Sequence, residues 1–102
     1  MGGDAFDANA LDDVIHGRVR LGAMSYLMGS GEAEFAVLRE RLATTDGNLS
    51  VHLRKLEDAG YVEISKSFRD RKPLTRVAVT DAGRKAFVAY LDALSRLIES
   101  RP

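Results

Sequence analysis

The chain of 102 residues has room for one small domain, and its 45% hydrophobic residues are enough for a packed core. Its 15 basic and 15 acidic residues cancel, so the net charge does not indicate a nucleic-acid partner. The sequence contains no cysteine, which excludes disulfides, thiol redox sensing and cysteine-ligated metal sites. It shows neither a secretory signal nor an apolar run of about 18 residues, so we expect a cytoplasmic chain with no membrane partner.

The N-terminal region is expected to be disordered over residues 1–8, and the domain to span residues 9–102. A first helix is predicted to begin near Asn9, where an acidic first turn suits the helix dipole. The pair His16-Gly17 is expected to break this helix. Its apolar side consists of Leu11, Val14 and Ile15.

Apolar residues recur at helical spacing in two further stretches, which predicts helices over Arg18–Met28 and Glu34–Ala43. The glycine-rich stretch 29–31 separates these two helices. A polar link, residues 44–46, then leads into a helix predicted over Asn48–Ala59. Two short helices joined by such a tight link are typical of a helix-turn-helix.

The helix predicted over Asn48–Ala59 has an apolar stripe of leucines and an opposite face that is small, polar and basic. Thr45 or Asp46 supplies its N-cap oxygen, and Gly60 ends it. A helix that enters the major groove with its N-terminus first needs such a face. An ordinary amphipathic helix with a solvated face explains this stretch equally well. The candidate DNA contacts are Thr45, Asn48, Ser50, Val51, His52, Arg54 and Lys55.

After Gly60 the hydrophobic period changes to two, which predicts strands over residues 61–67 and 74–79. The basic, turn-like stretch 68–73 joins them into a hairpin. A hairpin directly after the second helix of a helix-turn-helix is a wing. We expect Phe68 to be buried at its base. The candidate DNA contacts of the wing are Lys66, Arg69, Arg71 and Lys72.

Thr80 is predicted to cap a last helix over residues 81–100, which carries two apolar stripes. Together the stripes make a face wider than one contact normally needs. One stripe can therefore dock on the core while the other contacts a second copy of the chain, although a single broad contact within one chain remains the alternative. The candidate dimer interface consists of Leu11, Val14, Ile15, Tyr90, Leu94, Leu97 and Ile98.

The ordered set of motifs resembles the small winged-helix transcriptional regulators of the ArsR/MarR type. The residues that carry the resemblance are 16–21, 45–57, 59–62, 66–68, 71–75 and 79–87. The resemblance implies an α+β, mainly α fold, a winged helix-turn-helix with a long C-terminal dimerisation helix. It also implies a homodimer that places a recognition helix in the major groove and a wing on the backbone or in the minor groove.

The function that we expect is sequence-specific binding to a double-stranded DNA operator, which we expect to be palindromic, by a homodimeric regulator. We expect a repressor, and the sequence leaves activation open as well. The alternative is a winged-helix module that binds proteins and never contacts DNA. A mainly basic wing favours DNA. The cysteine metal sites of ArsR relatives have no counterpart here, and the sequence does not identify a small-molecule effector.

Catalytic and metal chemistry find little support in the sequence. Asp12 and His16 are spaced to share a helix face, but no third metal ligand accompanies them. Ser50 lacks a general base and an oxyanion site. His52 has two interpretations, a groove contact or a residue on the flank of its helix. We therefore expect no metal, no cofactor and no enzymatic activity.

Overall fold

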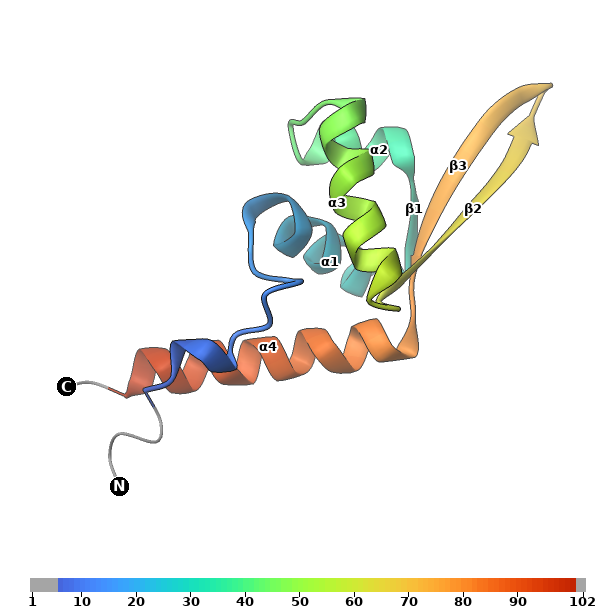
Figure 1. Cartoon of the computed structure of the whole chain (residues 1–102). Coiled ribbons are helices and arrows are strands. Elements are labelled where there is room, and N and C mark those ends of the chain that lie inside the picture. Colours follow the sequence, from blue (N-terminus) through green and yellow to red (C-terminus); the bar gives the residue numbers. More distant parts are fainter. Residues whose placement is uncertain (1–5, 101–102) are drawn as a thin grey trace.

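The computed structural model describes residues 6–100 as a small helical body from which a hairpin extends (Figure 1). The fold confirms the predicted winged helix, because four helices accompany one antiparallel sheet. Of residues 1–8, which were predicted to be disordered, residues 1–5 lie outside the described residues, whereas Ala8 begins a short 3-10 helix. None of the helices within 6–100 is both long and apolar enough to cross a membrane. The elements are η2 (Ala8–Ala10), α1 (Arg18–Ser30), β1 (Glu32–Glu34), α2 (Phe35–Arg41), α3 (Asp46–Asp58), β2 (Val62–Arg69), β3 (Lys72–Val79) and α4 (Asp81–Glu99).

The three predicted helices of the body are confirmed as α1, α2 and α3, with ends that shift by a few residues. Gly31 ends α1 at φ 80°, and its N–H donates to the Leu27 carbonyl over 2.7 Å. Gly60 follows α3 at φ 81° and donates to the Glu57 carbonyl over 2.9 Å. Both glycines occupy left-handed backbone that other residues adopt only with strain, which is why the helices end there.

The core lies where the leucine stripe of α3 packs against α1. The side chains of Leu49, Leu53 and Leu56 are at most 1% exposed, and they share one cluster with Met24 and Leu27. Burial of each such side chain stabilises the fold by roughly 1.5–3 kcal/mol. The stripe therefore fixes which side of α3 faces outward.

The sheet contains a third strand that the sequence analysis missed. Strand order is β1-β3-β2, all antiparallel, and β1 pairs Glu32 with Ala78 and Glu34 with Arg76. The helix predicted from Glu34 begins at Phe35 instead. Three residues are too short to show an alternating pattern, and their pairing partner lies far along the chain.

The N-terminal segment does not form the predicted helix. It has a short 3-10 helix, η2, followed by turns. The Asp12 side chain accepts from the Val14 N–H over 2.8 Å, and the Asp12 carbonyl accepts from the His16 N–H, also over 2.8 Å. Aspartate side chains compete in this way with helical hydrogen bonds, which explains the failure of the helix prediction.

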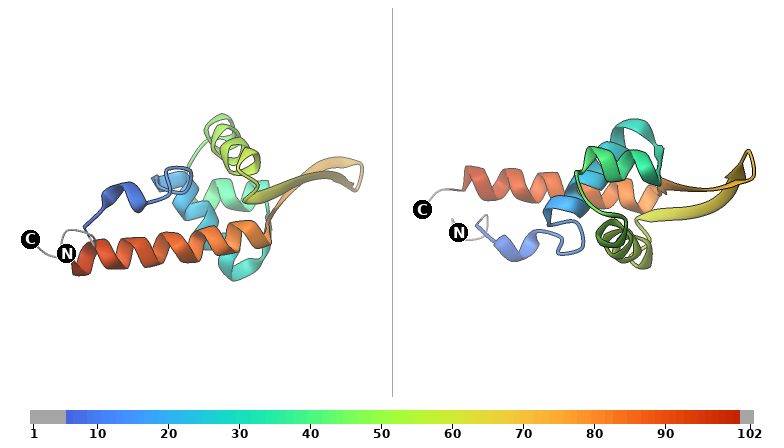
Figure 2. Two further views of the ribbon diagram at one scale, coloured as in Figure 1. Left: turned by 60° about the horizontal axis from the view of Figure 1, so that its bottom comes forward. Right: turned by 90° about the horizontal axis from the view of Figure 1, so that it is seen from above.

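Helix α4 runs along the base of the molecule, and η2 packs beside its C-terminal half (Figures 1 and 2). Ile15 is fully buried and Tyr90 is 2% exposed, in the core of a single chain. The prediction that these two side chains contact a second chain is therefore wrong. The folded-back N-terminal segment occupies part of the wide α4 face. The His16 Nδ1 atom, for example, lies 2.8 Å from the Tyr90 hydroxyl.

The other residues of the predicted dimer interface differ in how exposed they are. Leu11, Val14 and Leu94 are partly buried against the core. Leu97 is half-buried, whereas Ile98 is 64% exposed. Two exposed apolar residues of α4, Val88 and Leu91, were not among the predicted contacts.

A hydrogen bond between Tyr61 and Asp12 also fixes the N-terminal segment. The Tyr61 hydroxyl donates to the Asp12 carboxylate over 2.5 Å. This bond, together with burial and the carboxylate charge, raises the pKa of Tyr61 to about 12. The pKa of Tyr61 in the folded chain exceeds the ordinary tyrosine pKa of 10.0, so the stabilisation is complete below pH 10 and is lost as the pH rises toward 12.

We therefore expect one tyrosine to ionise near pH 12 in an ultraviolet absorbance titration. Asp12→Asn should move this ionisation to lower pH, because it removes the charged acceptor. Asp13→Asn is the matched control, since it removes a neighbouring carboxylate that does not accept from Tyr61. An Asp12→Asn titration curve identical to that of the unmodified chain would contradict the assignment.

Candidate nucleic-acid interface

The N-terminus of α3 is held by its cap and by a neighbouring ion pair. The Thr45 hydroxyl accepts from the Asn48 N–H over 3.2 Å, as the sequence predicts for an N-cap. Arg39 of α2 pairs with Asp46 over 2.8 Å, and this carboxylate raises the pKa of Arg39. Thr45 thus has a structural role in the chain, in addition to its predicted place in the interface.

The outward face of α3 carries five of the predicted DNA contacts. One of them is apolar: the Val51 side chain is 55% exposed, although α3 is otherwise polar on this side. The Asn48 amide donates to the Thr44 hydroxyl over 2.7 Å, which orients it at the first turn. Such a mixture of amide, hydroxyl, methyl and guanidinium groups can contact base edges and thymine methyl groups. The exposed members are Asn48, Ser50, Val51, Arg54 and Lys55.

His52 is turned away from this face, on the flank of α3. Its Nδ1 atom lies 2.7 Å from the Arg20 guanidinium of α1. The pKa of His52 is lowered by burial first, and then by the positive charges of Arg20, Lys55 and Arg18. The same Arg20 donates to the Val14 carbonyl over 2.6 Å. Of the two interpretations of His52, the geometry therefore matches the flank residue, which links α3 to α1 and the N-terminal segment.

The wing is a tight hairpin whose tip is basic. Strands β2 and β3 pair from Val62–Val79 to Arg69–Lys72, so only two residues form the turn. These residues, Asp70 and Arg71, have φ of 51° and 69°. Two positive φ values are characteristic of a type I′ hairpin turn. The turn projects Arg71 from the end of the wing. All four predicted wing contacts, Lys66, Arg69, Arg71 and Lys72, are exposed.

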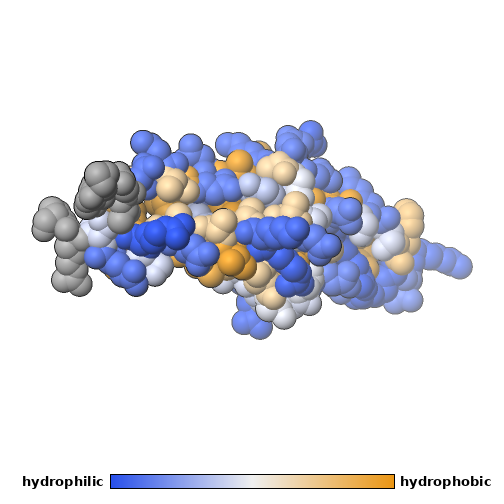
Figure 3. Space-filling view, turned by 90° about the horizontal axis from the view of Figure 1, so that it is seen from below, coloured by the Kyte–Doolittle hydropathy of each residue, from blue (hydrophilic) through white to orange (hydrophobic). Residues whose placement is uncertain are grey.

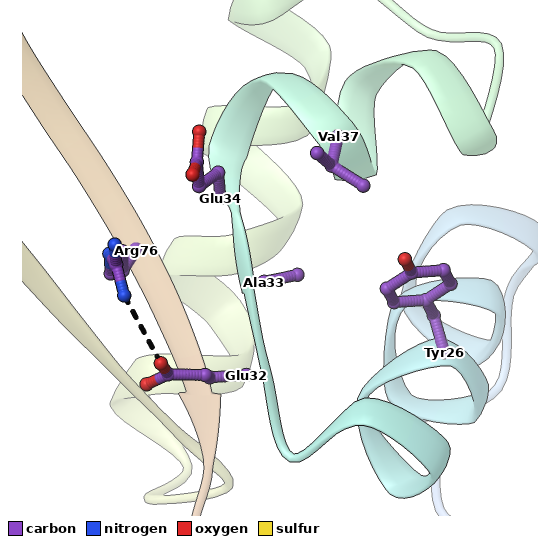
Figure 4. Close-up of a pocket in the computed structure, with 6 residues that line it drawn as sticks. All are labelled: Tyr26, Glu32, Ala33, Glu34, Val37 and Arg76. Carbon is purple, nitrogen blue, oxygen red and sulfur yellow. Dashed lines mark hydrogen bonds and ion pairs between the residues drawn. The ribbon is translucent and has the colours of Figure 1, made fainter.

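One of the wing cations has a partner that the sequence did not reveal. Arg69 pairs with Glu34 of β1 over 2.8 Å, and Arg76 pairs with Glu32 over 3.3 Å. Figure 4 shows the second pair at the edge of a hollow of about 220 Å³. These carboxylates reduce the positive charge on this side of the wing and tie it to β1. Within residues 6–100, Lys66, Arg71 and Lys72 have no ion-pair partner.

A second hollow, of about 350 Å³, separates α3 from the wing. Its walls bring together two predicted contacts from different elements, Arg54 of α3 and Lys66 of β2. Two cations facing one open groove suit the phosphate backbone of nucleic acid. The groove is lined by Phe35, Ser50, Leu53, Arg54, Glu57, Ile64 and Lys66.

Phe68 was predicted to lie buried at the base of the wing, and this prediction is wrong. Its side chain is 74% exposed and lies near the tip, opposite Pro73. The hairpin is longer than the alternating pattern suggested, because β2 runs to Arg69. The extra length moves Phe68 away from the body.

Metal-ligating side chains do not gather anywhere in residues 6–100 in groups of three or more. The two residues considered for a metal have other contacts, since Asp12 accepts from Tyr61 and His16 lies against Tyr90. In the described part of the chain, the exposed polar and basic side chains that could form a binding site therefore lie on α3 and the wing.

Comparison with known proteins agrees with this geometry. An uncharacterized protein of Methanocaldococcus jannaschii, MJ0432, is 40% identical over 79 residues, which cover 78% of this chain and 86% of that protein. A transcriptional regulator homologue from Pyrococcus horikoshii OT3 has a TM-score of 0.80 at 32% identity, over 95% of this chain and 92% of that one. A MarR-family transcriptional regulator from Silicibacter pomeroyi shares the fold, with a TM-score of 0.61 at 21% identity, over 85% of this chain and 56% of its own.

The family model for the winged helix DNA-binding domain matches residues 19–98, from the first turn of α1 to the last turn of α4. The match includes the whole helix-turn-helix and the whole wing. The chain therefore belongs to the winged helix DNA-binding domain family.

Proposed function

We propose that this chain is a sequence-specific, double-stranded DNA-binding repressor that acts as a homodimer on a palindromic operator. The observation that carries the proposal is the groove between α3 and the wing. Ser50 and Arg54 of the proposed base-reading face lie on one wall and Lys66 lies on the other, while Arg71 and Lys72 are exposed at the wing tip. In this arrangement α3 enters the major groove while the wing follows the backbone toward the minor groove.

The proposal assigns different roles to the phosphate contacts and to the base contacts. Lys66, Arg71 and Lys72 neutralise phosphates, which supplies affinity that does not depend on sequence. Arg54, Val51 and Asn48 supply the discrimination, for example through a bidentate arginine–guanine contact or a valine–thymine methyl contact. Occupation of a promoter is enough to repress it, so repression requires no further contact with the transcription machinery.

The proposal includes a homodimer because a single recognition helix contacts only a short stretch of DNA. One recognition helix reads only a few base pairs, which is too little to find one site in a genome. Two copies related by a two-fold axis would read half-sites about 10 base pairs apart. Helix α4 supplies a candidate contact, since Val88, Leu91 and Ile98 leave an exposed apolar side on it. Figure 3 shows hydrophobic groups on the underside of the molecule, where Figure 1 places α4.

The proposal is tested by a pair of substitutions, one on α3 and one at the tip of the wing. Arg54→Ala should weaken binding to the selected operator by roughly 5- to 150-fold and to random DNA much less, because a bidentate base contact gives ~1–3 kcal/mol of discrimination. Arg71→Gly should weaken both alike and reduce the slope of log affinity against log salt by about 1. Fluorescence anisotropy at several salt concentrations measures both effects.

Glycine is the better replacement at position 71 because the backbone there has φ of 69°. Glycine adopts this conformation without strain, so the hairpin should keep its stability and a loss of binding cannot be ascribed to unfolding. If Arg54→Ala weakened binding to the operator and to random DNA equally, Arg54 would contact the phosphate backbone of the DNA rather than a base. Failure of the unmodified chain to bind any duplex would favour the protein-binding alternative.

A further inference from the structure

Phe68 is the most exposed large hydrophobic side chain of residues 6–100, at 74%. Its cross-strand neighbour is Pro73, and both lie within two residues of the turn. A cross-strand pair of this kind adds a few tenths of a kcal/mol to a hairpin at most positions. That contact leaves about three quarters of the surface of Phe68 in solvent, so it does not account for an aromatic residue at this position.

The pairing register shows which face of the wing carries the ring. Residues directly opposite in an antiparallel pair project to the same face, and alternate pairs share that face. Phe68–Pro73 therefore shares a face with Lys66–Thr75 and Ile64–Val77. Ile64 and Lys66 line the groove against α3. The Phe68 side chain thus extends the wall of the groove toward the hairpin tip. In Figure 1 the hairpin tip and the N-terminal half of α3 both lie on the side of the molecule away from α4.

Cations surround this apolar group. Lys66 precedes it on the same face and Arg71 follows it in the turn, whereas Lys72 lies opposite Arg69 and projects to the other face. All three cations are exposed and have no ion-pair partner in the described residues. Arg69, which projects to the other face, is held by Glu34. An exposed aromatic side chain with one cation beside it on the same face and others at the adjacent turn complements a surface with an apolar interior and anionic edges. In a DNA groove, stacked bases lie between two rows of phosphates.

We propose that Phe68 is a wedge that the wing inserts from the minor groove between two stacked base pairs, which kinks the DNA. This inference rests on the proposed DNA binding and deepens it. Apolar wedges unstack one base step and bend the duplex toward the major groove. Pyrimidine–purine steps unstack most easily, so the wedge selects for such a step at a position where no hydrogen bond reads a base. Phe68 is then a specificity-determining residue.

The test uses the full chain and a duplex that it selects from a random library. One strand carries 2-aminopurine at the step under the wing, and the two ends carry a fluorophore pair for energy transfer. Binding of the unmodified chain should raise the 2-aminopurine emission and shorten the end-to-end distance. At saturating protein, Phe68→Ala should abolish both signals and bind about ten-fold more weakly. Phe68→Leu, which keeps an apolar wedge, should retain most of both.

Arg71→Gly is the matched control. It removes a proposed contact to the DNA phosphates and so lowers affinity, but it leaves Phe68 in place. At saturation it should unstack and bend the DNA as the unmodified chain does. The inference is overturned if Phe68→Ala keeps both signals, or if it binds as tightly as the unmodified chain. A bound, straight duplex with no change in emission overturns it while leaving the proposed function intact. Absence of any duplex binding, or binding of anionic lipid vesicles through Phe68 instead, overturns both.

Discussion

Gly83→Ala is expected to lower the free energy of unfolding by about 3 kcal/mol. Gly83 is buried in the first turn of α4, where its N–H donates to the Thr80 hydroxyl over 2.9 Å. A Cβ atom on Gly83 would lie 2.1 Å from the Tyr61 carbonyl oxygen. Because that atom belongs to the backbone between α3 and β2, it cannot move without disturbing both elements.

Thermal or urea unfolding followed by circular dichroism measures this effect. Gly29→Ala is the matched control, since Gly29 lies in α1 and nothing surrounds its Cβ position within 4 Å. It should stabilise the chain by about 0.5–1 kcal/mol, because alanine is the better helix former. A Gly83→Ala variant as stable as the unmodified chain would show that α4 does not pack so closely on Tyr61.

Leu91→Glu is expected to convert the proposed dimer to monomers and to weaken operator binding by about 100-fold or more, because two linked half-site contacts are replaced by one. Leu91 is 46% exposed, between Val88 and Ile98 on the uncovered side of α4. A charge in the centre of an apolar interface is costly to bury. The same charge is harmless in a monomer, since the site is open to water. The variant should therefore keep its fold.

Ala89→Glu is the matched control, because Ala89 is exposed on α4 and lies about 200° around the helix from Leu91. It adds the same side chain on the opposite surface and should leave dimerisation unchanged. Sedimentation velocity at micromolar concentration measures the association state, and anisotropy measures operator affinity. An unmodified chain that sediments as a monomer yet binds its operator tightly would defeat the dimer proposal.

Much of the fold was predictable because local patterns specify its elements. One short stretch contains the leucines of α3, its N-cap Thr45 and the glycine at which it ends, Gly60. This stretch forms a helix in the folded chain, as predicted. The alternation in β2 and β3 and the Thr80 cap of α4 were equally local. Five α3 residues predicted to face outward are exposed for the same reason, since the buried stripe fixes the opposite face.

Tertiary structure decided the features that depend on partners distant in sequence. Strand β1 exists because β3 pairs with it, and Glu34 becomes the partner of Arg69 only through that pairing. The N-terminal segment has apolar residues at helical spacing, but Asp12 captures its backbone N–H groups and Tyr61 holds the carboxylate.

The same division explains which interface predictions failed. Periodicity identified the apolar residues of the N-terminal segment and α4, but it could not distinguish a contact within one chain from a contact between two. Folding the segment back buried Ile15 and Tyr90 and left Leu91 and Ile98 outside. Phe68 is exposed because pairing carried β2 farther than its alternating pattern. Local propensity acts over a few residues, whereas burial is set by the sum of all neighbours, which only the folded chain brings together.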